Sequence, residues 1–335
     1  MFISVIIPTK DRPTLLERVL SGLVKQDFPR DSFEVIIIDD GSTKENQAKL
    51  QDLAKNLALD IHTYSKDRSE GPAKARNLGV SYAKGEWIAF TDDDVEIPPN
   101  WLRIAHDSIG QNPNIVGIEG SISTDIIHPL YHSTQNVKGK YSKRFEGYLT
   151  ANMFYRKSTL VSIGGFDETF PWAFREDAEL ALRLLALGRV PYCSALQVHH
   201  PARKITLMDA IRREIRHESD PLLNKKHPDK YPCLFAQTNL MWLMLIVVQL
   251  GGAILGAFVP WTIWGLNLFW LASVFATLGF FILGKGITKG VYRWFGSYVR
   301  FYAFFRGSLK YRTFFSIISL TLKARKFGPI QTDCI

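Results

Sequence analysis

The sequence has few cysteines and no recognisable leader. Its three cysteines, Cys193, Cys233 and Cys334, have neither a pairing pattern nor the spacing of a metal site. This usage favours a reducing compartment over a disulfide-stabilised secreted domain. The opening stretch MFISVIIPTK contains no basic segment followed by a long apolar one, so we expect no cleaved signal peptide.

Charge is missing from one long segment. No Asp, Glu, Lys or Arg lies between Lys230 and Lys285, and Pro260 interrupts this run near its middle. Because a bilayer core needs about 20 apolar residues per helix, the run predicts a transmembrane helical hairpin over 233–284. A very apolar helix pair in a soluble core is the alternative. Basic residues at both outer ends predict that the flanks, and therefore the domain that precedes the hairpin, face the cytoplasm.

Negative charge is almost absent from the end of the chain. From Lys285 onward there are ten basic residues and one acid, Asp333, so this tail carries 10 − 1 = +9, which is the whole formal charge of the protein. Its arginines and lysines alternate with aromatic residues, which predicts an amphipathic basic tail over 285–335 that contacts membrane lipids. A nucleic-acid partner is disfavoured beside a membrane hairpin. A connector over 206–232 is predicted to be amphipathic and juxtamembrane, and a homo-oligomer stays open.

Phosphate-binding glycine loops are also missing. Neither GxxxxGK[ST] nor GxGxxG occurs in the sequence, which disfavours ATPases and dinucleotide-dependent enzymes. The stretch DDDVEIPPNW lacks the alternating ligands and central glycine of a calcium-binding loop. A metal or phosphate site in this chain would therefore be formed by residues outside these known loop motifs.

The first part of the chain alternates strand and helix patterns. Short apolar runs and helically spaced apolar residues follow one another over 2–8, 12–26, 33–42, 44–57, 59–65, 71–85 and 86–94. This βαβ series predicts an α/β domain with a mostly parallel sheet and helices on both faces.

Carboxylates follow three of the predicted strands. Asp11 follows the first, Asp39-Asp40 ends the second, and the run from Asp92 to Asp94 ends the fourth. Because ligands of such sheets bind beyond the carboxyl ends of the strands, we expect these acids to share one site. Their mutual repulsion is tolerable if a hard divalent cation, Mg²⁺ or Mn²⁺, lies among them. A metal and a diphosphate at a sheet edge indicate a nucleotide-sugar site.

An ordered set of stretches between residues 3 and 203 resembles the family 2 inverting glycosyltransferases of the GT-A fold. In chain order these stretches are SVIIPTKDR, VIIIDDGS, GPAKARNLGV, FTDDDVEIPPNW, GGFDETF and REDAELALRLLALG. The resemblance implies a Rossmann-like GT-A nucleotide-sugar glycosyltransferase domain over 1–205 and a metal-dependent, hexosyl-transferring enzyme.

The resemblance also implies which residues hold the donor. Pro8, Thr9 and Asp11 would lie against the nucleoside. Asp40 would bind the base or ribose, and Arg76 would lie near the base or diphosphate.

The run of three aspartates matches the family's DxD motif as Asp92-x-Asp94. Asp94 would contact the metal, Asp92 the ribose or the sugar, and Asp93 could share either task. LQVHHPAR matches the family's late metal ligand, and its spacing favours His200 over His199.

Glu176-Asp177 matches the family's ED motif, which makes Asp177 the implied catalytic base and Glu176 its catalytic neighbour. Inverting displacement at an anomeric carbon needs a base that takes a proton from the acceptor hydroxyl. The alternative for Asp177 is a structural acid at the start of a helix.

The acceptor is less defined than the donor. The QxxRW signature of processive polysaccharide synthases is absent, because Gly290 precedes Arg293-Trp294 where glutamine is required. Residues 120–160 form either an acceptor loop or a solvated connection. Three functions remain: transfer of a sugar to a lipid-linked or cell-surface glycan, synthesis of a polyprenyl-phosphate sugar, or a non-catalytic membrane scaffold, which would be expected to lose the DxD or ED motif.

Overall fold

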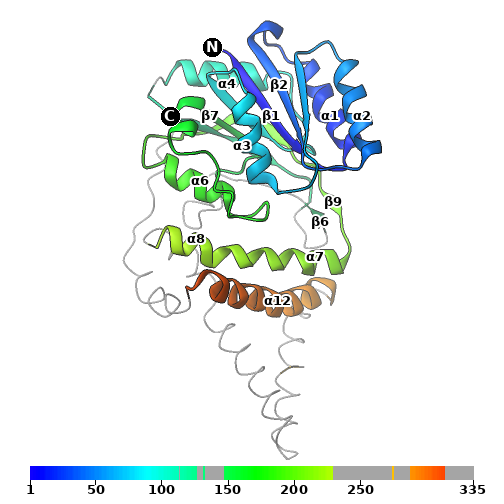
Figure 1. Ribbon diagram of the computed structural model, residues 1–335, viewed down its shortest axis with the longest axis vertical. Helices are drawn as coiled ribbons and strands as arrows, with labels where there is room; N and C mark the ends of the chain where they lie inside the picture. The colour runs from blue at the N-terminus through cyan, green and yellow to red at the C-terminus, as the bar shows by residue number, and fades with distance from the viewer. Residues whose placement is uncertain (113, 127–130, 133–146, 229–273, 275–286, 314–335) are drawn as a thin grey trace, which may run out of the picture. The chain divides into compact units, whose positions relative to one another are not determined.

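The chain forms two structural units, which are described separately. The computed structural model describes residues 1–112, 114–126, 131–132, 147–228, 274 and 287–313 (Figure 1). One unit holds the described residues up to 202 except 131–132, and the other holds 131–132 and the described residues from 203 onward.

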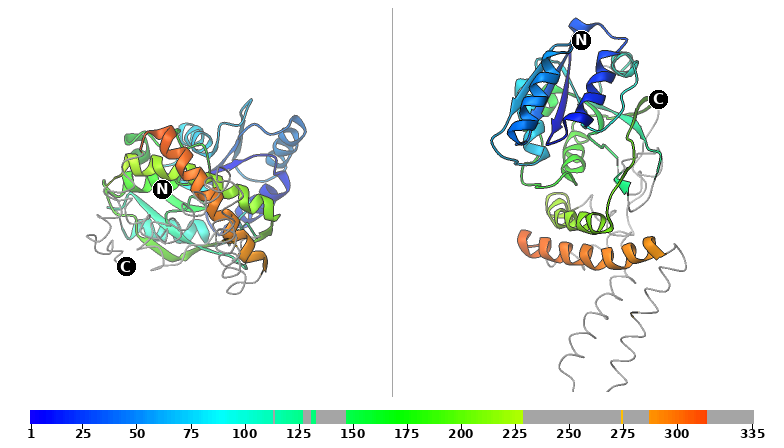
Figure 2. Two further views of the ribbon diagram at one scale, coloured as in Figure 1. Left: turned by 90° about the horizontal axis from the view of Figure 1, so that it is seen from below. Right: turned by 90° about the vertical axis from the view of Figure 1, so that its right-hand side faces the viewer.

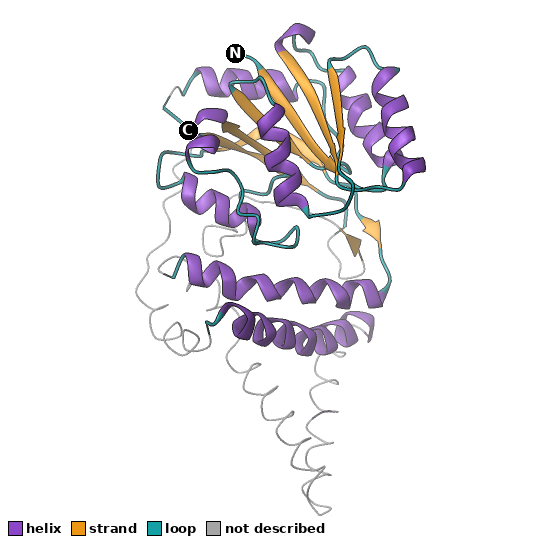
Figure 3. Cartoon of the chain, viewed as in Figure 1, coloured by secondary structure: helices purple, strands orange, loops and turns teal. Residues whose placement is uncertain are grey.

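The first unit is built on a seven-stranded sheet, whose strands are drawn as orange arrows in Figure 3. The strand order is β3-β2-β1-β4-β7-β5-β8. The strands are β1 (Ile3–Thr9), β2 (Phe33–Asp39), β3 (Ile61–Ser65), β4 (Trp87–Thr91), β5 (Gly117–Ser123), β7 (Asn152–Arg156) and β8 (Tyr192–His199). Strand β7 runs antiparallel to both β4 and β5, whereas the other neighbouring pairs are parallel. The prediction of a mostly parallel α/β sheet is therefore confirmed.

Helices cover both faces of this sheet because its central strands are apolar on both sides. Val5 and Ile7 of β1 belong to one core, and Ile6 between them belongs to the other, since successive strand residues point to opposite faces. The helices of this unit are α1 (Pro13–Val24), η1 (Arg30–Ser32), α2 (Lys44–Lys55), α3 (Pro72–Tyr82), α4 (Trp101–Gly110), α5 (Lys157–Ser162) and α6 (Glu176–Leu184). Helices α1, α2 and α4 contribute to the first core, and α3, α5 and α6 contribute to the second.

The second unit places a long helix beside a shorter helical run. This run consists of α7 (Leu207–Arg213), η2 (Glu214–Ser219) and α8 (Asp220–Lys226), and α12 (Ile287–Tyr311) packs along all three (Figure 2). Gly307 permits the close approach, because a Cβ there would lie 2.3 Å from the Glu218 carbonyl oxygen. A short antiparallel pair, β6 (Tyr131–His132) with β9 (Arg203–Lys204), completes the unit.

Ion pairs change the interpretation of the basic tail. Arg300 Nε lies 2.6 Å from Glu214, and Lys310 Nζ and Arg306 Nε lie 2.7 and 3.4 Å from Glu218. Three of the basic residues predicted to attract anionic lipid are therefore paired with carboxylates of the neighbouring helical run. The exposed apolar side chains of α12 follow one another at helical spacing; they are Phe295, Tyr302, Phe305 and Leu309.

The predicted hairpin over 233–284 lies outside the described residues, apart from residue 274. Within the part of the chain that the structure describes, no helix is both long and apolar enough to span a bilayer. The hairpin thus stays a prediction.

Candidate active site

Three parallel strands bring their carboxyl ends to one edge of the sheet. β1 pairs with β2 up to Thr9 and Asp39, and the Asp40 amide donates to the Thr9 carbonyl at 2.9 Å. The Thr9 hydroxyl in turn donates to Asp93 at 2.7 Å, which ties β1 to the chain that follows β4. Pro8 lies half-buried within β1. The acids that follow β1, β2 and β4 are thereby gathered at this edge.

A group of possible metal ligands forms there. Ligand atoms of Asp92, Asp94 and His200 all lie within 4.8 Å of one another. His200 Nε2 is 3.2 Å from an Asp94 oxygen, and the His200 amide donates to the Ser123 carbonyl at 2.8 Å just beyond β8. Two carboxylates and an imidazole suit Mn²⁺ or Mg²⁺ with further ligands from phosphate or water, so the residues fit the predicted cation.

The structure separates the two neighbouring histidines. His199 is not part of the group and lies near Asp125, with Nε2 3.2 Å from the carboxylate. Asp92 also joins the group, although the sequence assigned it to the ribose or sugar and assigned Asp94 and His200 to the metal.

Asp93 is held apart from this group by its own partners. Arg12 Nη1 lies 3.1 Å from Asp93 and 3.6 Å from Asp94. Burial raises the pKa of Asp93 to about 6, although Arg12 and the Thr9 hydroxyl oppose that rise. Sequence reasoning did not single out Arg12, but its position directly after the first strand, in the KDR stretch, was a usable signal. Asp93 is thus paired with Arg12 and Thr9 at this edge, and its predicted share in binding the donor or the metal stays a prediction.

Asp11 links the loops that follow β1 and β2. Its backbone is left-handed, with φ 53, and its carboxylate accepts from the Thr43 amide at 2.8 Å and from Asn46 at 2.9 Å. The Asp11 amide donates to the Ser42 hydroxyl at 2.7 Å. The side chain is exposed at the site edge, as its predicted place beside a nucleoside requires.

Asp40 uses both of its oxygens within the protein. One accepts from Lys66 at 2.8 Å and from the Glu70 amide at 3.0 Å, and the other accepts from Ser69 at 2.7 Å and from the Gly71 amide at 2.9 Å. Burial alone would raise the pKa of Asp40, but these four donors together lower it. Each carboxylate oxygen has about two lone-pair sites, so a direct bond to a base or ribose would have to displace one donor. The structure thus gives Asp40 a role in shaping the 66–71 loop, which sequence analysis missed.

Arg76 joins the DxD and ED motifs. Its guanidinium is buried, 2.8 Å from Glu176 and 3.4 Å from Asp92. Glu176 is also buried, and its Oε2 has no hydrogen-bond partner among the described residues. Burial is the largest influence on the pKa of Glu176 and raises it, while Arg76 acts in the opposite direction. Glu176 is therefore paired with Arg76 inside the protein. Asp177, its neighbour in the ED motif, is the more accessible acid.

Asp177 lies half-buried in the first turn of α6. One of its oxygens accepts from the Ala178 amide at 2.7 Å. Burial, followed by the charge of Glu176, raises the pKa of Asp177 to about 7. The residue before the motif, Arg175, has φ 77, a left-handed conformation that costs a non-glycine residue about 1–3 kcal/mol. A carboxyl group with this pKa exchanges protons near neutral pH, which suits a general base.

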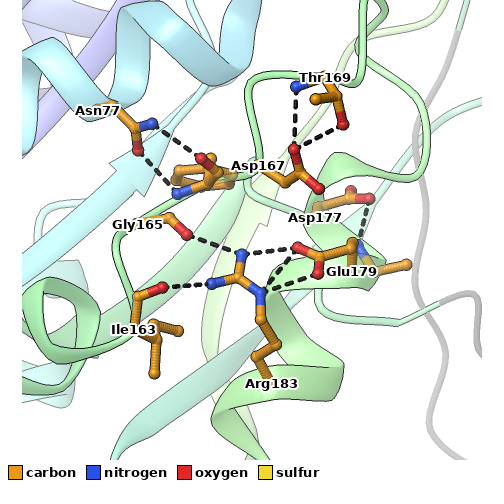
Figure 4. Close-up of polar contacts among 10 residues, drawn as sticks. Asn77, Ile163, Gly165, Asp167, Thr169, Asp177, Glu179 and Arg183 are labelled. Carbon is orange, nitrogen blue, oxygen red and sulfur yellow. Dashed lines mark hydrogen bonds and ion pairs between the residues drawn. The ribbon is translucent and has the colours of Figure 1, made fainter. Parts of the chain in front are cut away.

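The GGFDETF stretch is tied to two helices (Figure 4). Asn77 of α3 exchanges two hydrogen bonds with the Phe166 backbone, at 2.8 and 2.9 Å. Arg183 of α6 donates to the carbonyls of Ile163 and Gly165 at 2.8 and 2.7 Å and also binds Glu179. Both residues lie in stretches quoted for the family resemblance, but sequence reasoning gave neither a role. They attach this loop to the helix that carries Asp177.

Arg183→Met is expected to destabilise the protein by about 3–5 kcal/mol, because it leaves the buried Glu179 carboxylate without its cation. Chemical denaturation of the full chain measures this change. Arg103→Met is the matched control, since Arg103 and Asp27 are about half exposed, and such surface pairs contribute about 0–1 kcal/mol. Equal losses in the two variants would contradict a stabilising role for the pair of Arg183 with Glu179.

Part of the chain matches a known protein family. Residues 4–170 match the family model for glycosyl transferase family 2. The chain therefore contains a family 2 glycosyltransferase domain, and the predicted family is confirmed at this level.

Two curated relatives match parts of the chain. The poly(ribitol-phosphate) β-N-acetylglucosaminyltransferase TarS of Staphylococcus aureus is 28% identical over 163 residues, which are 48% of this chain and 28% of TarS. The GalNAc(5)-diNAcBac-PP-undecaprenol β-1,3-glucosyltransferase of Campylobacter jejuni is 34% identical over 95 residues, 28% of this chain and 30% of that enzyme. The chain spans less than a third of either relative.

A solved structure shares the fold. The mannosyltransferase PcManGT of Pyrobaculum calidifontis, in complex with GDP-Man and Mn²⁺, superposes with a TM-score of 0.56 at 17% identity. The match covers 92% of this chain and 86% of that one. At this identity the likeness establishes the GT-A type of fold.

Proposed function

We propose that this protein is a metal-dependent, inverting glycosyltransferase that moves a sugar from a nucleotide-sugar donor to a hydroxyl group of a lipid-linked or cell-surface glycan. One observation carries the proposal: Arg76 connects Asp92 of the possible metal group to Glu176, the immediate neighbour of Asp177. A cation-binding group and a carboxyl group with a near-neutral pKa are thus built into one network.

The donor would bind at the carboxyl edge of β1, β2 and β4. Asp92, Asp94 and His200 would hold Mn²⁺ or Mg²⁺, which when bound offsets negative charge on the diphosphate. Asp11 and the loop organised by Asp40 would lie along the nucleoside. The complex of PcManGT with GDP-Man and Mn²⁺ supports this assignment by analogy of fold.

Asp177 would supply the base. Its carboxylate takes the proton from the acceptor hydroxyl as the acceptor oxygen forms its bond to the anomeric carbon. The bond from that carbon to the nucleoside diphosphate breaks on the opposite face, and the electron pair leaves with the diphosphate. Attack from the face opposite the leaving group inverts the anomeric configuration. Glu176 and Arg76 hold the start of α6, which sets the direction of the Asp177 side chain.

The proposal also covers the acceptor, which would be lipid-linked, and the location of the protein in the membrane. The uncharged run after Lys230 supports an integral membrane protein with its catalytic domain on the cytoplasmic face. The name of the Campylobacter relative, an enzyme acting on an undecaprenol-linked glycan, supports a lipid-linked acceptor. A surface-bound catalytic domain would meet such an acceptor at the bilayer.

The test is product identification with the full chain. Membranes containing the protein are incubated with a panel of radiolabelled nucleotide sugars, and lipid and glycan products are separated and sequenced. Transfer of one sugar to a glycan hydroxyl supports the proposal. Transfer to a polyprenyl phosphate instead would identify a lipid-phosphate sugar synthase, and absence of transfer from every donor would contradict a glycosyltransferase.

A further inference from the structure

A second group of possible metal ligands lies at the opposite, amino edge of the sheet. It consists of Glu34, Asp60 and His62, whose ligand atoms all lie within 4.8 Å of one another. Glu34 is the second residue of β2, and His62 is the second residue of β3, paired with Ile36. Because Glu34 and Ile36 are two apart on one strand, Glu34 and His62 share a face of the sheet.

The carboxylate of Glu34 is fully buried and held in a fixed direction. Its Oε1 accepts from the Ser4 hydroxyl and from the Lys84 amide, both at 2.6 Å. Ser4 is itself held by the Gly85 amide, which donates to its hydroxyl at 2.7 Å. Supporting hydrogen bonds of this kind orient the carboxylate ligands of metal ions.

The second oxygen of Glu34 lacks such a donor. Oε2 is buried and has no hydrogen-bond partner within the described residues, and it is directed at His62, with 3.7 Å to Nε2. A buried charged oxygen without a hydrogen bond is costly, so a site there is expected to bind a cation.

The two distances from His62 lie on either side of the spacing of tetrahedral ligands. His62 Nε2 lies 3.1 Å from an Asp60 oxygen and 3.7 Å from Glu34 Oε2. Zinc bonds of about 2.0–2.1 Å at tetrahedral angles place ligand atoms roughly 3.3 Å apart. Asp60 is exposed and His62 half-buried, so the fourth position faces solvent.

Lys84 is the competing cation. Its Nζ lies 3.5 Å from Glu34 Oε2 and 3.4 Å from His62 Nε2. The side chain is 63% exposed, so it can turn into solvent at little cost when another cation arrives. A simple ion-pair cluster of Lys84, Glu34 and His62 is the alternative that an experiment has to separate from a metal site.

We propose that Glu34, Asp60 and His62 form a second divalent metal site that takes zinc or a similar borderline metal. One imidazole nitrogen and two carboxylate oxygens with an open fourth position match the ligands of such ions. The site would join β3, the outermost strand of the sheet, to β2 and stabilise this edge. It is separate from the sugar-transfer chemistry and does not depend on the proposed function.

Zinc binding by the purified full chain tests this site. The titration uses the double variant Asp94→Asn/His200→Ala as the background protein. This variant lacks two ligands of the candidate active site, so the zinc that it binds reports on the second site. Titration calorimetry with ZnCl₂ is expected to show one equivalent bound. Adding His62→Ala or Asp60→Asn is expected to weaken that binding at least ~100-fold, more than loss of a supporting residue does. Lys84→Met is expected to tighten it, because it removes the competing ammonium group.

A second measurement tests the site even if the Asp94→Asn/His200→Ala variant folds poorly. In the native chain, His62→Ala is expected to remove one equivalent of tightly bound zinc, measured by elemental analysis, and to abolish the zinc-dependent rise in the unfolding temperature. Binding that is unchanged by His62→Ala and Asp60→Asn would overturn the proposal. So would a folded background that binds no zinc even with Lys84→Met, which would leave an ion-pair cluster as the explanation.

Discussion

Asp177→Asn is expected to reduce sugar transfer by about 10²–10⁴-fold while leaving donor affinity nearly unchanged, because a general base contributes this much to rate and the amide cannot accept the acceptor proton. The substitution preserves shape, and the amide oxygen can still accept from the Ala178 amide. Transfer rates with saturating donor, together with calorimetric donor affinity, measure the two effects. Asp52→Asn, on the exposed side of α2, is the matched control and should retain native activity.

The pH dependence of the native protein gives a further check on Asp177. Because the pKa of Asp177 is raised to about 7, activity should rise with pH through that value as the carboxylate forms, and the Asp177→Asn variant should lose this limb.

Stability should change with pH in the opposite direction. The contribution of Asp177 to the stability of the folded state falls as the pH rises from the ordinary pKa of 3.8 through about 7, since ionisation of this carboxyl is costlier in the folded chain than in the unfolded one. Asp177→Asn should therefore raise the unfolding temperature more at pH 8 than at pH 5. Native turnover in Asp177→Asn, or a native pH–activity profile without a rise near pH 7, would refute Asp177 as the base.

His200→Ala and Asp94→Ala form the second large prediction. Each is expected to lower transfer by about 10²-fold or more, because charge stabilisation of several kcal/mol depends on the cation that these residues would hold. Manganese titration of the same variants should show weakened binding. Each variant also removes one half of the 3.2 Å contact between Asp94 and His200, so thermal unfolding must accompany the activity measurement.

His199→Ala is the matched control for this pair. The two histidines are adjacent, but His199 lies beside Ser123 and Asp125, with 3.1 Å from the Ser123 hydroxyl to Nδ1. It should retain most of the activity and the metal affinity. Equal losses in His199→Ala and His200→Ala, or full native activity in excess chelator, would contradict the metal assignment.

The local pattern of the sequence was enough to predict much of this site. Apolar runs that end in acids identified β1, β2 and β4, and parallel pairing then required those acids to meet at one edge. The spacing of VxHP in LQVHHPAR favoured His200, and the structure brings this histidine to Asp92 and Asp94. The ED motif was assigned as a unit, and only the buried pair of Glu176 with Arg76 shows that its two acids differ.

Other features required knowledge of long-range contacts. The position of Arg12 after the first strand places it near the predicted site, but the local sequence does not identify Asp93, more than eighty positions away, as its partner. Hydrogen bonds from four groups to Asp40 likewise come from a loop about thirty residues along the chain. The basic residues of α12 were interpreted through their charge alone, although three of them form ion pairs with Glu214 and Glu218.

The sequence by itself predicted the α/β class, a family 2 glycosyltransferase domain and the residues that form the candidate site. Periodicity and strand-end residues are local properties, and the motifs lie in short continuous stretches. Only the tertiary structure decided which acids are accessible and which are already used, since burial and pairing depend on contacts between distant segments. It is for this reason that Asp177, with its pKa near 7, differs from Glu176 beside it, and that Asp93 differs from Asp92 and Asp94 on either side.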